Sequence, residues 1–142
     1  MLPPDLTPGP ALDARVGDAM GAEPKWAICD TADGWVSTTV WSTPDDAEES
    51  RQMWAHPERC RVIPVYPAYS APTGGAWEAC QRWITAQHLT MALYFLGEQV
   101  ECEVFVGSEK EDPIIRVFGD TAALAVCAAV LAVSGRGHDE PR

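Results

Sequence analysis

Apolar and polar residues alternate with the period of a β-strand in the second half of the chain. Val100, Cys102, Val104 and Val106 alternate with two glutamates, which predicts a strand with one buried and one partly wet face. The apolar runs LTMALYFL before it and IIRVF after it predict two more strands, and Gly97-Glu98-Gln99 joins the first two as a hairpin. We therefore expect a mainly antiparallel sheet.

Other stretches have the spacing of helices. Leu12, Val16 and Met20 lie four residues apart and are followed by Gly21, a natural helix end. Thr43 and Pro44 precede a run of acidic residues, an arrangement that favours the start of a helix. A further helix is predicted from Thr73 to about Gln87.

The last predicted helix begins after Asp120 or Thr121 as its cap and ends at Gly135. Its sequence, DTAALAVCAAVLAVSG, is apolar on nearly every side. A surface helix needs only one apolar stripe, so this helix is either central or covered by a partner subunit. The second alternative predicts a homo-oligomer.

The middle of the chain has a pattern of its own. KWAICDTADGWVSTTVW contains two β-rich runs around TADG, which predicts a hairpin, and RCRVIPVYP is an extended run that Pro64 restricts to a sheet edge. Together with the helix after Thr43, these runs predict a ββαβ-like insertion over residues 23–65.

The apolar positions of the predicted strands and helices define an expected core. Its members are Leu12, Val16, Trp77, Ile84, Met91, Leu93, Val104, Val106, Ile115, Val117, Leu124 and Leu131.

Composition narrows the classes of function. Hydrophobic residues make up 46% of the 142-residue chain and charged residues 22%, a balance typical of a globular protein. The net charge of −11 argues against direct binding of nucleic acid, which needs Lys and Arg against the phosphates. It permits binding to a basic protein surface, and it is also explained by solubility alone.

The cysteines and the N-terminus indicate a soluble protein of a reducing compartment. Cys80, Cys102 and Cys127 lie among apolar neighbours and are expected to be small buried hydrophobic residues. MLPPDLTPGP lacks the features of a signal peptide, and the apolar stretch from Ala122 to Val133 is shorter than the roughly 20 residues that cross a bilayer.

The sequence lacks the patterns that a metal site or a catalytic site requires. Cys29, His56 and Cys60 could converge, with Asp30 or Asp33 as a fourth ligand, but structural zinc sites usually show two close ligand pairs and this set has one. The sequence contains no nucleophile motif such as GxSxG. The paired carboxylates lie at a predicted helix start or in a predicted turn, where such residues are usually solvated surface charges. We expect no metal, no cofactor and no enzymatic activity.

The most suggestive segment is Tyr69–Trp83, YSAPTGGAWEACQRW. Thr73, Gly74 and Gly75 at a predicted helix start offer backbone N–H groups that could hold an anion. Nearby aromatic rings could stack on a nucleotide, and Arg82 supplies a cation. The other interpretation is that the aromatic residues only pack in the core and that the glycines are neutral changes at a tolerant helix start. The candidate ligand-binding residues are Tyr69, Thr73, Gly74, Gly75, Trp77 and Arg82.

Three stretches resemble the phage ABA sandwich domain family. Members typically begin with an LDALVAE-like helix that ends in Gly, and ALDARVGDAMG stands here. They carry Tyr-Ser before an Ala-rich stretch and Trp, matched by Tyr69, Ser70, Ala76 and Trp77, and they end with an ADTAPLAICRAAL-like helix, matched by DTAALAVC. The chain departs from the family where Ala-Pro-Thr-Gly-Gly replaces its Thr-Asp, which puts any role of that Asp in doubt.

The resemblance covers about residues 10–22 and 66–135 and implies a bacteriophage accessory protein. It implies an α+β fold whose mainly antiparallel sheet is sandwiched between helices. The whole chain, 1–142, is then one domain, with 1–9 and 136–142 as loose termini.

Small accessory proteins of phages commonly act against host defences, so the reducing compartment is expected to be the host cell cytoplasm. Our first expectation is a non-enzymatic, homo-oligomeric protein that binds and sequesters a small anionic, nucleotide-type immune signal. The alternatives are an acidic inhibitor that binds a host defence protein directly, and a structural or assembly protein without a ligand.

Overall fold

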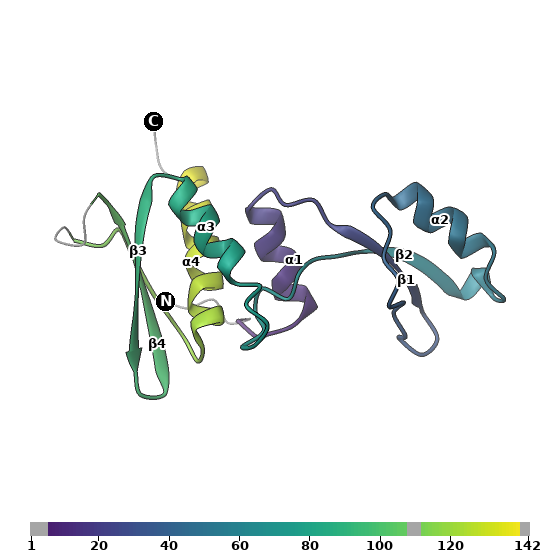
Figure 1. The fold of residues 1–142 in the computed structure, drawn as a ribbon, viewed down its shortest axis with the longest axis horizontal. Coiled ribbons are helices and arrows are strands. Elements are labelled where there is room, and N and C mark those ends of the chain that lie inside the picture. The colour runs from purple at the N-terminus through teal and green to yellow at the C-terminus, as the bar shows by residue number, and fades with distance from the viewer. Residues whose placement is uncertain (1–5, 108–111, 140–142) are drawn as a thin grey trace. The chain divides into compact units, whose positions relative to one another are not determined.

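The computed structural model describes residues 6–107 and 112–139. It forms two compact units: unit 1 comprises Met1–Ala22 and Pro67–Arg142, and unit 2 comprises Glu23–Tyr66 (Figure 1). Helices and two antiparallel sheets make an α+β fold, so the predicted class is confirmed. That 1–142 form one domain stays a prediction. Of the ends predicted to be loose, residues 1–5 and 140–142 lie outside the described part.

Unit 1 contains the three strands predicted from the alternating segment and from the two apolar runs. They are β3 (Leu89–Leu96), β4 (Gln99–Val106) and β5 (Ile115–Gly119), paired antiparallel in the order β3-β4-β5. Leu96 lies opposite Gln99, so the hairpin loop consists of Gly97 and Glu98. Gly97 has a φ of +73°, which suits the first position of a two-residue hairpin turn.

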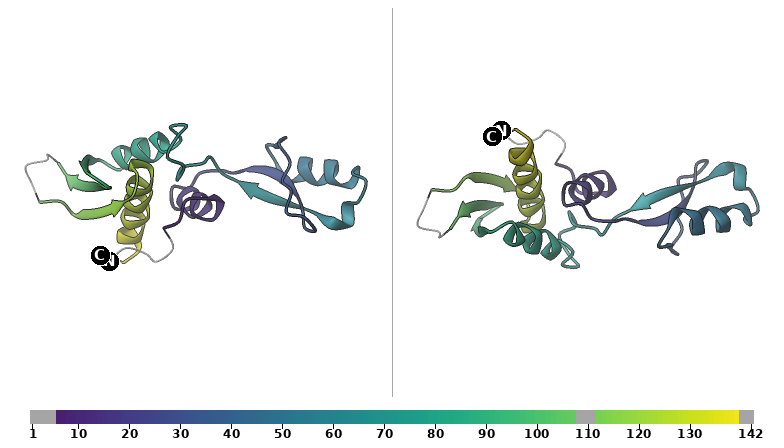
Figure 2. Two further views of the ribbon diagram at one scale, coloured as in Figure 1. Left: turned by 90° about the horizontal axis from the view of Figure 1, so that it is seen from below. Right: turned by 90° about the horizontal axis from the view of Figure 1, so that it is seen from above.

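Helices pack on the sheet of unit 1 in two layers. In unit 1, α4 (Ala122–Asp139) contacts β4 and β5, α3 (Glu78–Ala86) contacts β3, and α1 (Pro10–Ala19) packs on α4. Both views of Figure 2 show α4 between the sheet and α1. A Cβ added to Gly119 would lie 2.6 Å from the backbone nitrogen of Ala125, so α4 covers the sheet face that carries Gly119.

The central position of α4 explains its apolar sequence. The side chains of residues 123–130 are all buried, between the sheet on one side and α1 and α3 on the other. Cover by a partner subunit is therefore not needed to account for this helix. The Thr121 hydroxyl accepts a hydrogen bond from the Leu124 N–H at 3.2 Å, as predicted for a cap. The predicted end at Gly135 is wrong, because the helix continues through this glycine to Asp139.

The expected core agrees with the structure at most positions. Leu12, Val16, Ile84, Val104, Ile115 and Leu124 are buried, and Trp77, Met91, Leu93, Val117 and Leu131 are half-buried. The prediction that Val106 belongs to the core is wrong, because its side chain is 53% exposed. The pairing of β4 with β5 ends at Val104 opposite Ile115, so Val106 lies beyond the part of β4 that has neighbours on both sides.

The opposite face of the sheet carries an ionic cluster. Arg116 Nε lies 2.8 Å from a carboxylate oxygen of Glu101 and 2.8 Å from one of Glu103. On the helix-covered face, burial and then these two glutamates raise the pKa of Cys102 to about 12, so its thiol stays protonated. Cys80, Cys102 and Cys127 are buried free thiols, which confirms the prediction from their apolar neighbours.

Unit 2 is built on one pair of strands. In it, β1 (Lys25–Asp30) pairs antiparallel with β2 (Cys60–Val65), and α2 (Pro44–Gln52) contacts both. The 3₁₀ helix η1 (Pro57–Arg59) precedes β2. The predicted cap of α2 is confirmed, because the Thr43 hydroxyl accepts the Asp46 N–H at 3.2 Å.

The predicted second arm of the TADG hairpin forms only isolated bridges. Trp41 pairs with Trp26 and Val36 with Cys29 on the free side of β1. Between these bridges the Ser37 hydroxyl, instead of a backbone carbonyl, accepts the Ile28 N–H at 3.0 Å. The side chain interrupts the regular ladder, so no continuous strand forms there.

A buried carboxylate ties α1 to the segment that precedes α3. Asp13 is 7% exposed, and its Oδ1 accepts hydrogen bonds from the Ser70 N–H at 2.8 Å and the Ser70 hydroxyl at 2.7 Å. The same hydroxyl oxygen accepts the Gly9 N–H at 2.9 Å. The sequence pattern alone gave no indication of this contact.

No helix in the described ranges is both long and apolar enough to cross a membrane.

We predict that Asp13→Ala lowers the free energy of unfolding by about 1–3 kcal/mol, because it leaves the buried Ser70 donors without an acceptor. The matched control is Asp18→Ala, which removes the same charge from an exposed position of α1. Urea denaturation followed by circular dichroism measures both. Equal, small effects of the two substitutions would contradict the role given to Asp13.

Candidate functional site

The glycine segment does not start a helix. The prediction of a helix from Thr73 is wrong, because α3 begins at Glu78 with Trp77 as its cap residue. Gly74 and Gly75 have φ values of +94° and +73°, in the left-handed region that a right-handed helix excludes. These glycines therefore form a turn in front of the helix, in which Gly74 is exposed and Gly75 is half-buried.

The electrostatics of this turn do not favour an anion. A Cβ added to Gly75 would lie 3.2 Å from Glu78 Oε1, so a carboxylate already stands beside the turn. The Glu78 N–H donates to the Gly75 carbonyl at 3.1 Å and is thus not available to a ligand. An anion bound here would be repelled by Glu78.

The remaining predicted ligand-binding residues are only partly accessible. Thr73 and Arg82 are exposed and Trp77 is half-buried, but Tyr69 is buried and cannot stack on a ligand from solution. The structure therefore brings Thr73, the two glycines and Trp77 together along one stretch of the chain, and it places Tyr69 in the interior. Ligand binding at these six residues stays a prediction.

The considered metal set does not come together. Strand pairing places Cys60 opposite Asp30 but Cys29 opposite Arg61, so the two cysteines point to opposite faces of the strand pair. His56 lies on an exposed loop, where its Nδ1 is 3.7 Å from Glu58. Within residues 6–107 and 112–139, no three His, Cys, Asp or Glu side chains form a group that could hold a metal ion.

Two aromatic rings of unit 2 lie in contact, and one of them is exposed. The rings of Trp35 and Trp54 lie 5.5 Å apart between centroids at an interplanar angle of 47°, and we call them the tryptophan pair. Trp35 is 50% exposed, and Met53, next to Trp54 in the chain, is 84% exposed. The sequence shows the cluster of tryptophans in this segment, but it leaves open whether they form a small core or an exposed patch. Trp35 is on the surface, and Trp26, Trp41 and Trp54 are half-buried.

Hydrogen bonds hold the loop that carries Trp35. The Asp33 carboxylate accepts the Trp35 N–H at 2.9 Å. Asp30 accepts the Ala32 N–H at 2.8 Å and pairs with Arg59 at 2.9 Å. These contacts, with the Ala32 hydrogen bond as the larger, hold the pKa of the Asp30 carboxyl below its ordinary value.

The loop that carries Trp54 is fixed in a similar way. Arg51, in the last turn of α2, pairs with Glu48 and donates from Nη1 to the Pro57 carbonyl at 2.5 Å. This arginine lowers the pKa of the Glu48 carboxyl. Trp54 lies between the two anchor points, Arg51 and Pro57. Both rings of the tryptophan pair therefore stand on loops with defined conformations.

Unit 2 carries exposed carboxylates as well as the tryptophan pair. Asp45, Asp46 and Glu49 at the start and middle of α2 are exposed. Aromatic faces attract Lys and Arg side chains, and carboxylates do the same by charge. Among the described side chains of unit 2, this combination fits recognition of a basic, partly apolar surface.

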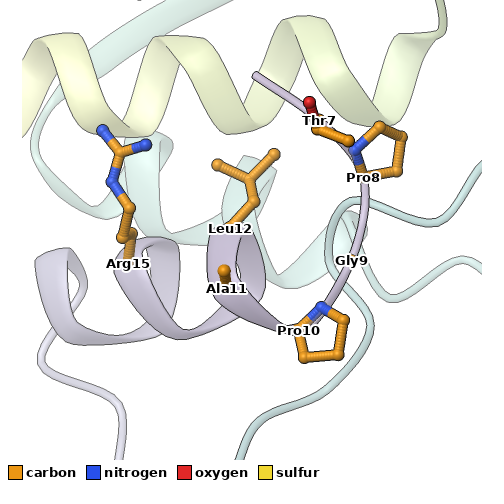
Figure 3. Close-up of a pocket in the computed structure, with 7 residues that line it drawn as sticks. All are labelled: Thr7, Pro8, Gly9, Pro10, Ala11, Leu12 and Arg15. Carbon is orange, nitrogen blue, oxygen red and sulfur yellow. The ribbon is translucent and has the colours of Figure 1, made fainter. Parts of the chain in front are cut away.

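A shallow hollow lies at the start of α1 in unit 1. It has a volume of about 290 Å³ and is lined by Thr7, Pro8, Gly9, Pro10, Ala11, Leu12 and Arg15. Figure 3 shows the Leu12 and Arg15 side chains extending from α1 toward the neighbouring helix. The lining is mainly apolar, and the sequence pattern did not predict it.

We predict that Gly75→Ala lowers the free energy of unfolding by about 1–2 kcal/mol, because alanine is strained at a φ of +73°. The helix-start interpretation predicts the opposite, a level or slightly higher melting temperature. Gly75→Asn is the matched control, since asparagine tolerates the left-handed region better than alanine. Thermal unfolding of the three proteins decides, and a melting temperature of Gly75→Ala at or above that of the unmodified chain would favour the helix start.

No protein-family model matches the chain, and neither a curated protein nor a solved structure matches it. The resemblance to the phage ABA sandwich family therefore stays a prediction.

Proposed function

We propose that this chain is a non-enzymatic binding protein that docks unit 2 on a basic surface of a partner protein. The observation that carries the proposal is the tryptophan pair, half exposed at Trp35 and held on two hydrogen-bonded loops. Exposed carboxylates of α2 belong to the same unit.

Tryptophan is among the residues that most often dominate the energy of protein interfaces. A ring that is already fixed before binding loses little conformational entropy when the complex forms. Asp33 fixes the backbone of Trp35, and Arg51 anchors the loop of Trp54. The pair is thus suited to fill a pocket or to stack on an arginine of the partner.

Charge supports the choice of a basic partner. The net charge of −11 and the exposed carboxylates of α2 would speed the encounter with a positive surface and would repel acidic proteins. If the resemblance to phage accessory proteins holds, a host defence protein in the host cytoplasm would be such a partner. The protein would then act as an acidic inhibitor.

Sequestration of a nucleotide-type signal is the second proposal. It is favoured by the two left-handed glycines, which expose the backbone of a turn close to Trp77, and disfavoured by the carboxylate of Glu78. Calorimetry with cyclic nucleotides and ADP-ribose derivatives distinguishes it from the first proposal. Absence of binding heat at high ligand concentration would reject nucleotide sequestration and would have no bearing on the proposed protein partner.

We predict that the immobilised chain retains a basic protein from host lysate at low salt, and that Trp35→Ala raises the Kd for this protein at least about 30-fold. That factor corresponds to the roughly 2 kcal/mol of an interface residue with a dominant contribution. Because part of the attraction is charge, affinity should also fall as salt is raised. Surface plasmon resonance with the identified protein measures both effects.

The matched control is Leu96→Ala, which removes an exposed apolar side chain from unit 1. It should leave the Kd unchanged. Retention of no protein at low salt, or equal affinity of the unmodified chain and Trp35→Ala, would refute the proposal.

A further inference from the structure

Strand β3 is an uncharged free edge of the unit 1 sheet. In the order β3-β4-β5, its only strand neighbour among the described residues is β4. Its sequence, LTMALYFL, contains no Pro, Gly or charged residue, whereas each of the other described strands carries at least one charged side chain. Edge strands usually carry charges, prolines or bulges that prevent pairing with another strand. This edge has none of them.

The hairpin register tells which backbone groups point outward. In a two-residue hairpin the closing pair, Leu96 and Gln99, exchanges hydrogen bonds, and such pairs then alternate along the ladder. Thr90, Ala92 and Tyr94 therefore bond to β4. The backbone N–H and C=O groups of the residues between them face the free edge; these are Leu89, Met91, Leu93 and Phe95.

A second observation agrees with this assignment. The Val104 carbonyl accepts the Ile114 N–H at 2.8 Å, so the backbone of Val104 turns toward the β5 side. Met91 lies opposite Val104, and its own backbone groups must then point away from β4.

We propose that the β3 edges of two copies of this chain pair antiparallel about a two-fold axis at Ala92. The two sheets then form one sheet of six strands, three from each copy. This register pairs all four outward-facing residues of each edge: Met91 opposite Leu93, and Leu89 opposite Phe95. Facing residues keep the same side of the sheet, so the helix-covered faces of both copies are continuous.

The same register covers apolar side chains that one copy leaves in water. Phe95 is 72% exposed and Val106 is 53% exposed, both on the helix-covered face. Leu89 lies opposite Val106 within the chain. Phe95 of the second copy would lie on the other side of Leu89, which gives a row of three apolar side chains across the junction. On the opposite face the two Ala92 side chains meet, and their small size permits close approach.

Charge favours a second copy at this edge. Two copies with a net charge of −11 repel one another, and contact is least opposed where a strand carries no charge. The two-fold pairing also needs no other sequence, because the outward residues of β3 complement themselves. The inference uses unit 1 only, so it does not depend on the partner proposed for unit 2.

Native mass spectrometry and light scattering test the assembly on the full chain. We expect a species of twice 15.4 kDa. Ala92→Lys should convert it into the monomer, because two like charges would face each other across the axis. The lysine would lie beside Glu103 of its own chain, so an unchanged circular dichroism spectrum should accompany the loss of the dimer. Val40→Lys, at an exposed apolar position of unit 2, is the charge-matched control and should stay dimeric.

A cysteine introduced at the axis tests the register. Cys29 and Cys60 are first replaced by Ser, since they are the free thiols that are not buried. Facing residues of a pair that exchanges no hydrogen bonds lie about 4.5 Å apart between Cα atoms, within the range of about 4.4–6.8 Å that a disulfide spans. Ala92→Cys should therefore form a covalent dimer under mild oxidation, whereas Thr90→Cys, which faces Tyr94 of the second copy, should not.

Three results would overturn the proposal. They are a full chain that stays monomeric at every concentration, a dimer that survives Ala92→Lys, and equal cross-linking of the two cysteine variants. A monomer that pairs its β3 edge with an extended peptide of another protein would likewise reject the second copy as the occupant.

Discussion

The close approach of α4 to the end of β5 is the constraint on which unit 1 depends. At Gly119 a single added carbon would stand 2.6 Å from a backbone nitrogen of α4, a distance that atoms not bonded to each other do not adopt. This contact lays α4 on the sheet face that also carries Val104 and Cys102, both fully buried. The other sides of α4 are then covered by α1 and α3. An almost entirely apolar helix is therefore stable in the interior of its own chain.

This arrangement decides which surfaces remain for binding. Because α4 is covered within unit 1, its composition does not require a partner, and association must use other surfaces. Two described surfaces have the necessary chemistry: the uncharged edge of β3 and the tryptophan pair of unit 2. In the two proposals, the first surface pairs its outward-facing backbone groups with a copy of the same strand, and the second places its aromatic rings on a basic protein. The two proposed interactions use different units.

The sequence predicted the features that follow from local patterns. Alternation identified β4, and apolar runs identified β3 and β5. The cap Thr43 and the choice of Asp120 or Thr121 as the second cap could be predicted because a cap acts within one turn. The prediction of a helix start at Thr73 was wrong, since adjacent glycines are compatible with either a helix start or a left-handed turn. The Asp13–Ser70 contact and the exposure of Trp35 depend on residues distant in the chain, so local patterns could not predict them.

The measurement that tests this account most directly compares two glycines by their free energy of unfolding. Gly119→Ala should lower it by about 1–3 kcal/mol, because the new methyl group has no space against α4. Gly135→Ala, within α4 where a Cβ would meet nothing within 4 Å, should raise it by up to about 1 kcal/mol through helix propensity. Opposite signs support α4 as the covered centre of unit 1. A Gly119→Ala protein as stable as the unmodified chain would contradict it.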